Sequence, residues 1–87
     1  MICFMTMKKI NKLLQIYGGY KKYKLSEKYT SNRKYELIFT HKFNEKLWLV
    51  MRKKDNGTIE VTQTNDTGKV IYRDVYEMFD DDFRKVV

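Results

Sequence analysis

Few side chains in this 87-residue chain could carry catalysis. His41 is the only histidine and Cys3 the only cysteine, so one chain cannot assemble a zinc site from Cys and His ligands. Ser26 and Ser31 have no base at a spacing that would activate them, and a Ser-His-Asp triad would have to use His41 on an expected strand. The glycines form no phosphate-binding loop. We therefore expect a protein that is not an enzyme and that uses no metal and no cofactor.

Three consecutive acids, Asp80, Asp81 and Asp82, are the next group with chemical potential. Carboxylates are good ligands for hard cations, but consecutive residues on a helix point about 100° apart. Because we expect this segment to be helical, we interpret the three acids as a solvated acidic face. The alternative is that they contact a basic surface of a partner.

The distribution of charge along the chain is more informative. Residues 1–54 hold fourteen Lys or Arg and three acids, a net charge of +11, whereas residues 55–87 hold four bases and eight acids, a net charge of −4. A half that carries this much positive charge repels itself unless negative charge compensates it. The compensation is either internal, from the acidic half, or external, from a polyanion.

The basic half also alternates cations with aromatic rings, a combination in which cations meet phosphates and ring faces stack on bases. We predict that this half binds nucleic acid, RNA or DNA, or a nucleoprotein. A Lys- and Tyr-rich composition with buried rings and solvated ammonium groups is the competing interpretation. The predicted binding residues are Lys21, Lys22, Lys24, Lys28, Arg33, Lys34, Tyr20 and Tyr23.

Helical periodicity is clear near the start of the chain. The apolar spacing predicts a helix over residues 7–17, with Thr6 as its N-cap and Gly18-Gly19 as its stop. Residues 20–34 show neither helical nor strand periodicity. A short strand at residues 23–25 and a loop are both compatible with them.

From Tyr35 the apolar period changes to two, which predicts strands at residues 35–40, 47–53 and 58–64. Asn44-Glu45 lies between the first two of these strands as a turn. Asn56-Gly57 is the most specific turn signal, because this pair tolerates the positive φ of a type I′ turn. We predict a hairpin that pairs Leu47–Lys53 with Thr58–Gln63. A turn at residues 65–68 and a short fourth strand at residues 70–72 follow.

The last segment returns to helical spacing through Val75, Phe79, Phe83 and Val86. Acids at positions 74 and 77 and bases at positions 84 and 85 fit the dipole of a helix over this range. We therefore predict a C-terminal helix, with Trp48 buried against Phe79 or Phe83.

These elements define one α+β domain over residues 1–87, a small antiparallel meander of three to four strands flanked by an N-terminal and a C-terminal helix (α-β-β-β-(β)-α). We interpret residues 1–6 either as disordered or as preceding the true start codon. No apolar stretch approaches the length of a membrane span, so we expect no membrane contact. The single cysteine favours a reducing compartment, and we expect a cytoplasmic protein.

The predicted element order resembles that of double-stranded-RNA-binding domains. That family has a basic second helix start, whereas residues 72–77 contain two acids, so we do not assign the chain to it. Small ribosome-dependent ribonuclease toxins also pack helices on a short sheet, but their signature cations are not matched residue by residue.

Small size and a coding bias toward Lys, Asn, Ile and Tyr resemble the early proteins that phages and other mobile elements direct against host machinery, anti-CRISPR proteins among them. This resemblance implies the alternative function: an inhibitor that blocks a host protein or defence nucleoprotein by protein–protein contact.

Overall fold

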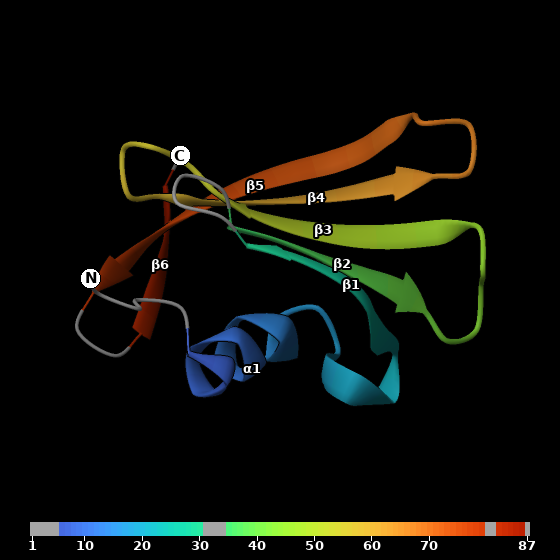
Figure 1. The fold of residues 1–87 in the computed structure, drawn as a ribbon, viewed down its shortest axis with the longest axis horizontal. Coiled ribbons are helices and arrows are strands. Elements are labelled where there is room, and N and C mark those ends of the chain that lie inside the picture. The colour runs from blue at the N-terminus through green and yellow to red at the C-terminus, as the bar shows by residue number, and fades with distance from the viewer. Residues whose placement is uncertain (1–5, 31–34, 80–81, 87) are drawn as a thin grey trace.

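A six-stranded antiparallel sheet dominates the computed structural model, which describes residues 6–30, 35–79 and 82–86. The strands lie in the sheet in the order in which they occur in the chain, β1 to β6 (Figure 1). Every neighbouring pair is antiparallel. The elements are the α-helix α1 (Met7–Gln15), the 3₁₀-helix η1 (Gly19–Lys21), and the strands β1 (Tyr23–Thr30), β2 (Tyr35–His41), β3 (Leu47–Lys53), β4 (Ile59–Asn65), β5 (Val70–Phe79) and β6 (Asp82–Val86).

This architecture corrects the predicted fold. A meander of three to four strands flanked by two helices is wrong: β1 and β6 extend the sheet at both edges, and the described residues contain a single α-helix. The ambiguous segment after Gly19 forms η1 and then the edge strand β1. The sequence showed no alternation there because β1 carries a bulge between Leu25 and Glu27, which shifts the side-chain parity within the strand.

The predicted C-terminal helix is replaced by the β5–β6 hairpin. Its charge pattern fits both structures: Arg84 Nε donates to Glu77 Oε1 at 2.9 Å across the hairpin, and Lys85 Nζ lies 3.1 Å from Asp74 Oδ1. Residues 70–79 are rich in β-branched and aromatic side chains, which pack well on a pleated sheet. Of the acidic triplet, Asp82 is exposed at the start of β6; Asp80 and Asp81 lie outside the described residues.

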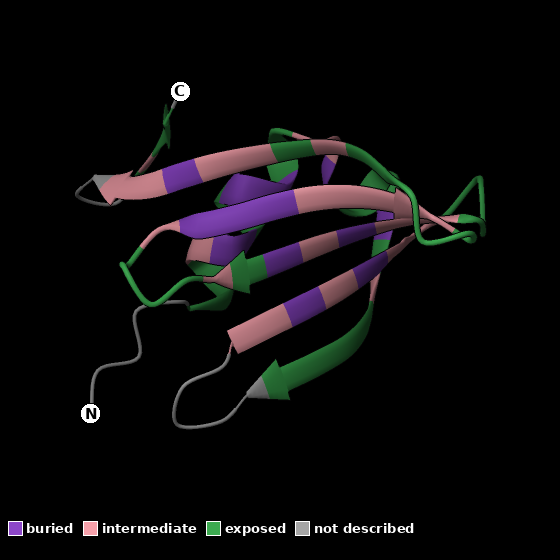
Figure 2. Ribbon diagram, turned by 90° about the horizontal axis from the view of Figure 1, so that it is seen from above, coloured by how far each residue is buried: buried purple, intermediate pink, exposed green. Residues whose placement is uncertain are grey.

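The core lies between α1 and one face of the sheet. The buried side of α1 consists of Ile10, Leu13 and Leu14, none of which is exposed to solvent. Figure 2 shows the matching buried segments on the central strands. The strands contribute Tyr23, Leu37, Phe39, Leu49, Met51, Ile59, Val61 and Tyr76 to this core.

Trp48 does not lie where the sequence predicted. It pairs across the strands with Thr40 and Thr64 and is half-buried on the sheet face that points away from α1. Phe83 instead packs on the core, with its ring 6.5 Å from that of Tyr76. The predicted contact of Trp48 with Phe83 is therefore wrong, and the side chain of Phe79 lies outside the described residues.

The local signals for turns and caps are confirmed. Thr6 accepts a hydrogen bond from Lys9 N at 3.3 Å as the N-cap of α1. The helix ends at Gln15, two residues before the predicted limit, and Gly18 follows with φ 119°. Residues 1–5 of the segment predicted to be disordered, or to precede the start, lie outside the described residues.

The predicted central hairpin is confirmed as β3–β4, with Lys53 opposite Ile59. Lys54 N donates to Thr58 O at 2.8 Å, and Gly57 has φ 87°. The turn at residues 65–68 is also present, since Gly68 N donates to Asn65 O at 3.0 Å.

Candidate functional site

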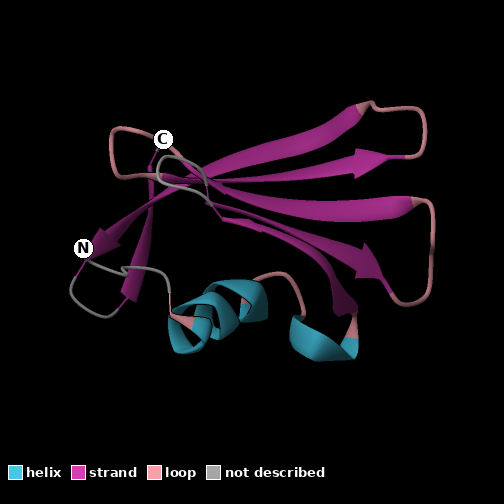
Figure 3. Cartoon of the chain, in the orientation of Figure 1, coloured by secondary structure: helices cyan, strands magenta, loops and turns pink. Residues whose placement is uncertain are grey.

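Successive turns of an antiparallel meander alternate between the two ends of the sheet. The turn between β2 and β3 therefore lies at the same end as η1, which precedes β1 (Figure 3). The two segments are joined directly: Lys42 N donates to Lys22 O at 2.7 Å, and Lys42 Nζ donates to Tyr20 O. We call the surface formed by residues 19–22 and 42–46 the basic end.

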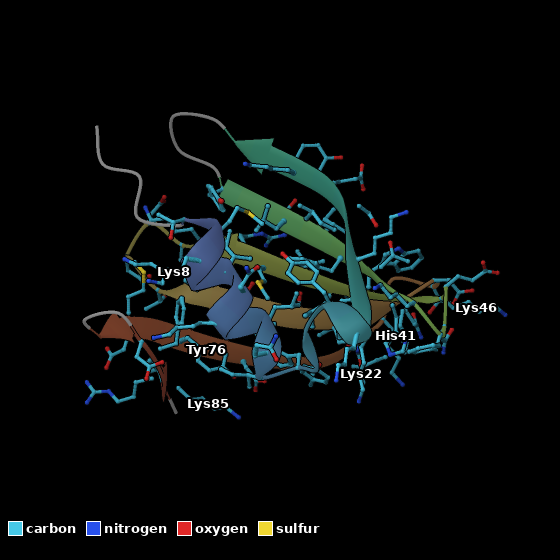
Figure 4. All side chains as sticks on the ribbon, turned by 90° about the horizontal axis from the view of Figure 1, so that it is seen from below. Lys8, Lys22, His41, Lys46, Tyr76 and Lys85 are labelled. Atoms are coloured by element: carbon cyan, nitrogen blue, oxygen red, sulfur yellow. The ribbon has the colours of Figure 1, made fainter. Side chains whose placement is uncertain are left out.

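Four exposed lysines lie at the basic end: Lys21, Lys22, Lys42 and Lys46. Glu45 is the only acid in the two segments. None of the four lysines forms an ion pair with an acid in the described part of the chain. In Figure 4, Lys22 and Lys46 lie at this end of the molecule, whereas Lys8 and Lys85 lie towards the other.

Two aromatic rings are exposed beside these lysines. Phe43 is 79% exposed, the most of any large hydrophobic residue described, and Tyr20 is 37% exposed. The ring of Phe43 makes an edge contact with His41 at 6.1 Å, and its backbone N donates to His41 Nδ1 at 3.1 Å. The ring of Tyr20 rests on the buried Phe39 at 6.5 Å. The site thus offers cations and ring faces together, which suits a ligand with phosphates and planar groups.

The structure brings only part of the predicted binding set together. Lys21, Lys22 and Tyr20 belong to the basic end. Tyr23 is 3% exposed and its hydroxyl accepts from Gln63 Nε2 at 2.7 Å, so its ring is not available for stacking.

The remaining cations of that set lie along β1 or beyond it. Lys24 follows Tyr23 and pairs with Thr40, and Lys28 is exposed near the far end of the strand. Arg33 and Lys34 lie outside the described residues. Thr30 and Tyr35, the described residues that flank them, pair at the opposite end of the sheet from η1.

Sequence reasoning missed Lys42, Phe43 and Lys46. Residues 44–45 were interpreted only as a turn. A signal was present, however, because Phe43 stands between Lys42 and Lys46 in a segment expected to be a turn. Turn positions favour Gly, Asn, Asp and Ser, which adapt to the backbone.

A second charged cluster lies on the open face of the sheet, and here the charges compensate one another. Glu60 is 9% exposed. Its carboxylate forms ion pairs with Arg73 Nε at 3.4 Å and with Arg52 Nη1 and Lys54 Nζ, each at 3.8 Å. Arg52 Nε also donates to Glu36 Oε2 at 2.8 Å. Acids of the C-terminal half thus neutralise some cations of the basic half, but not those of the basic end.

A third polar group lies under α1. Tyr17, in the turn that follows α1, donates to Asp74 Oδ2 at 2.8 Å and its hydroxyl lies 2.7 Å from that of Tyr76, while its ring stacks on Tyr72 at 6.0 Å. Tyr23 of β1 in turn accepts from Gln63 Nε2 of β4, a strand that is not the neighbour of β1 in the sheet. The sheet is therefore curled, and this contact between β1 and β4 crosses the concave side.

Burial is the main influence on these phenols. It raises the pKa of Tyr17 and of Tyr72 well above the usual value, and hydrogen bonds with Tyr76 and Asp74 raise that of Tyr17 further. Burial also raises the pKa of Tyr23, against the lowering effect of its bonds with Tyr72 and Gln63. Phenols held neutral in this way serve the packing of α1 rather than proton transfer near neutral pH.

The described residues contain no group of three or more His, Cys, Asp or Glu side chains that could hold a metal ion. No helix in the described ranges is long and apolar enough to cross a membrane. No protein-family model matches the chain, and neither a curated protein nor a solved structure matches it. The geometry of the chain itself therefore carries the functional argument.

Proposed function

We propose that this chain is a non-catalytic binding protein that engages nucleic acid, or a complex that carries nucleic acid, through the basic end. One observation supports the proposal above all. Two segments about 20 residues apart in sequence place Lys21, Lys22, Lys42 and Lys46 on one surface, without an acid paired to any of them in the described structure.

The fold separates these cations from the described acids of the C-terminal hairpin. Because the strands follow chain order, β1 and β6 form opposite edges of the sheet. Asp74 and Glu77 are engaged by Lys85 and Arg84 of their own hairpin. In the described part of the chain no acid forms an ion pair with the lysines of the basic end, and the release of counterions from a polyanion that they contact favours binding.

Co-purification with and without nuclease tests this function. We expect nucleic acid to co-purify with the wild-type protein from a cell lysate and to be removed by nuclease treatment. A variant with Lys21→Glu and Lys22→Glu should carry much less, because reversed charges repel phosphate. The matched control, Lys8→Glu with Lys9→Glu on α1, makes the same charge change away from the basic end and should behave like the wild type.

A bound partner that survives nuclease in full would contradict the proposal. It would instead favour a protein partner, as expected for an inhibitor of a host protein. Equal loss of nucleic acid from the two double variants would also contradict it, because binding would then follow net charge and not the basic end.

A further inference from the structure

The aromatic part of the basic end narrows the ligand class. Resting on the proposed function, we infer that the basic end binds single-stranded nucleic acid in preference to duplex, with the ring of Phe43 as the platform for an unpaired base. Lysines meet phosphates on either form, so they do not discriminate between the two. The exposed ring is what separates the two ligands.

The contacts that the structure describes for Phe43, an edge contact and a backbone hydrogen bond with His41, do not bury its ring. Its side chain is 79% exposed, and a phenyl ring has no polar atom with which to bind water. Leaving such an apolar area in solvent is unfavourable in proportion to its extent. A ligand that covers the ring therefore recovers this free energy.

The ring is nevertheless held in place. It makes a T-shaped contact with His41 at an interplanar angle of 69°, and its 79% exposure leaves most of the residue open to a ligand. His41 is braced in the same manner by the buried Tyr23, with ring centroids 5.0 Å apart. A series of three edge-to-face rings thus runs from the core to the tip of the turn, an arrangement that aromatic pairs prefer.

The turn that carries the ring is also fixed by its own hydrogen bonds. Lys46 N donates to Asn44 Oδ1 at 3.1 Å, and Leu47 N donates to Asn44 O at 3.0 Å. Lys42 is tied to η1 on the other side of the ring. Because these contacts fix the backbone of the turn and brace the ring of Phe43, less conformational entropy is lost when a ligand binds.

Base stacking on such a ring requires an unpaired base. In a duplex both faces of each base are covered by neighbouring pairs, so Phe43 would meet only sugar and phosphate. In a single strand a base can rotate onto the ring, which typically strengthens binding by about 1–3 kcal/mol per base. Tyr20, 37% exposed on the neighbouring segment, offers a second ring to the same strand.

The test compares two ligands of equal length at one salt concentration. Fluorescence anisotropy measures the affinity of an oligothymidine of about 16 nucleotides, the upper end of typical site sizes, and of a duplex of that length. Phe43→Leu keeps an apolar side chain but removes the stacking face. We expect it to weaken binding of the single strand by about 5- to 100-fold and that of the duplex less than about twofold, with an unchanged melting temperature.

Tyr29→Leu is the matched control, because Tyr29 is also an exposed ring, 46% accessible, but lies near the far end of β1. It should leave both affinities unchanged. Tight duplex binding that Phe43→Leu weakens as much as single-strand binding would overturn the inference, since Phe43 would then act as a wedge between base pairs. Binding of both ligands without any effect of Phe43→Leu would also overturn it, yet leave the proposed function standing. Failure of the wild type to bind either ligand would overturn both.

Discussion

Trp48 and Leu49 are adjacent in β3 but face opposite sides of the sheet. Leu49 is fully buried in the core under α1, whereas Trp48 is half-buried on the open face. We expect Leu49→Ala to lower the free energy of unfolding by about 2–5 kcal/mol, because it leaves a cavity in a packed core. Trp48→Ala should lower it by less than half as much, although it removes a larger side chain. Urea denaturation of both variants checks this order, and a larger loss in Trp48→Ala would show that the assigned strand face is incorrect.

Whether a side chain points to the core or to solvent also decided which residues of the site could be predicted from the sequence. The run from Leu47 to Met51 is wholly apolar, so its sequence does not say which residues point inward. In the basic half, Tyr20 and Tyr23 stand in similar surroundings in the sequence, yet one is exposed and the other is in the core. Lys21 and Lys22 are exposed, as binding requires, while their role in binding stays a prediction. The contribution of Phe43 depends on the pairing of β1 with β2, a contact between distant segments.

At the scale of elements, signals that are local in sequence were reliable. Asn56-Gly57 sets the β3–β4 turn and Thr6 caps α1, and both act within four residues. The prediction of a C-terminal helix was wrong because the same residues fit both the spacing of a helix and the pairing of two strands in a hairpin. Glu77 and Arg84 are seven apart, close to two helical turns, but they are also direct partners in the β5–β6 hairpin. Only the long-range packing of Tyr76 and Phe83 on the core decides between the two.

The partly and fully buried tyrosines make the stability of the fold depend on pH. The folded protein raises the pKa of Tyr17, Tyr72 and Tyr23, so it favours their neutral forms. This contribution to stability is fully present below the usual phenol pKa of about 10. It is lost as the pH rises towards the folded-state values, because the unfolded chain ionises first.

We therefore expect the free energy of unfolding to fall steeply above about pH 10. Phenolate absorbance should show that part of the tyrosines titrate only as the protein unfolds. Tyr17→Phe should be less stable at neutral pH, since a hydrogen bond to Asp74 is lost, but it should show a shallower alkaline decline. An equally steep decline in Tyr17→Phe would argue against a role for Tyr17 in this transition.

At the scale of the whole molecule, the strands lie in the sheet in the order of the chain, so β1 of the basic half and β6 of the acidic half form opposite edges. Part of the basic half is neutralised within the sheet around Glu60, and the C-terminal hairpin neutralises much of its own charge. Four of the described lysines that form none of these ion pairs lie at the basic end. The proposed function depends on whether the lysines of the basic end bind phosphate.

The salt dependence of binding to a single strand measures this most directly. With four lysines in contact with phosphates, the logarithm of the affinity should fall with the logarithm of the salt concentration at a slope of about −3. Lys21→Gln with Lys22→Gln should flatten that slope by roughly 1.4, which corresponds to two lost contacts. Lys8→Gln with Lys9→Gln should leave it unchanged. An affinity that is the same at about 50 mM and about 200 mM salt, or a slope that the two double variants change equally, would contradict the account.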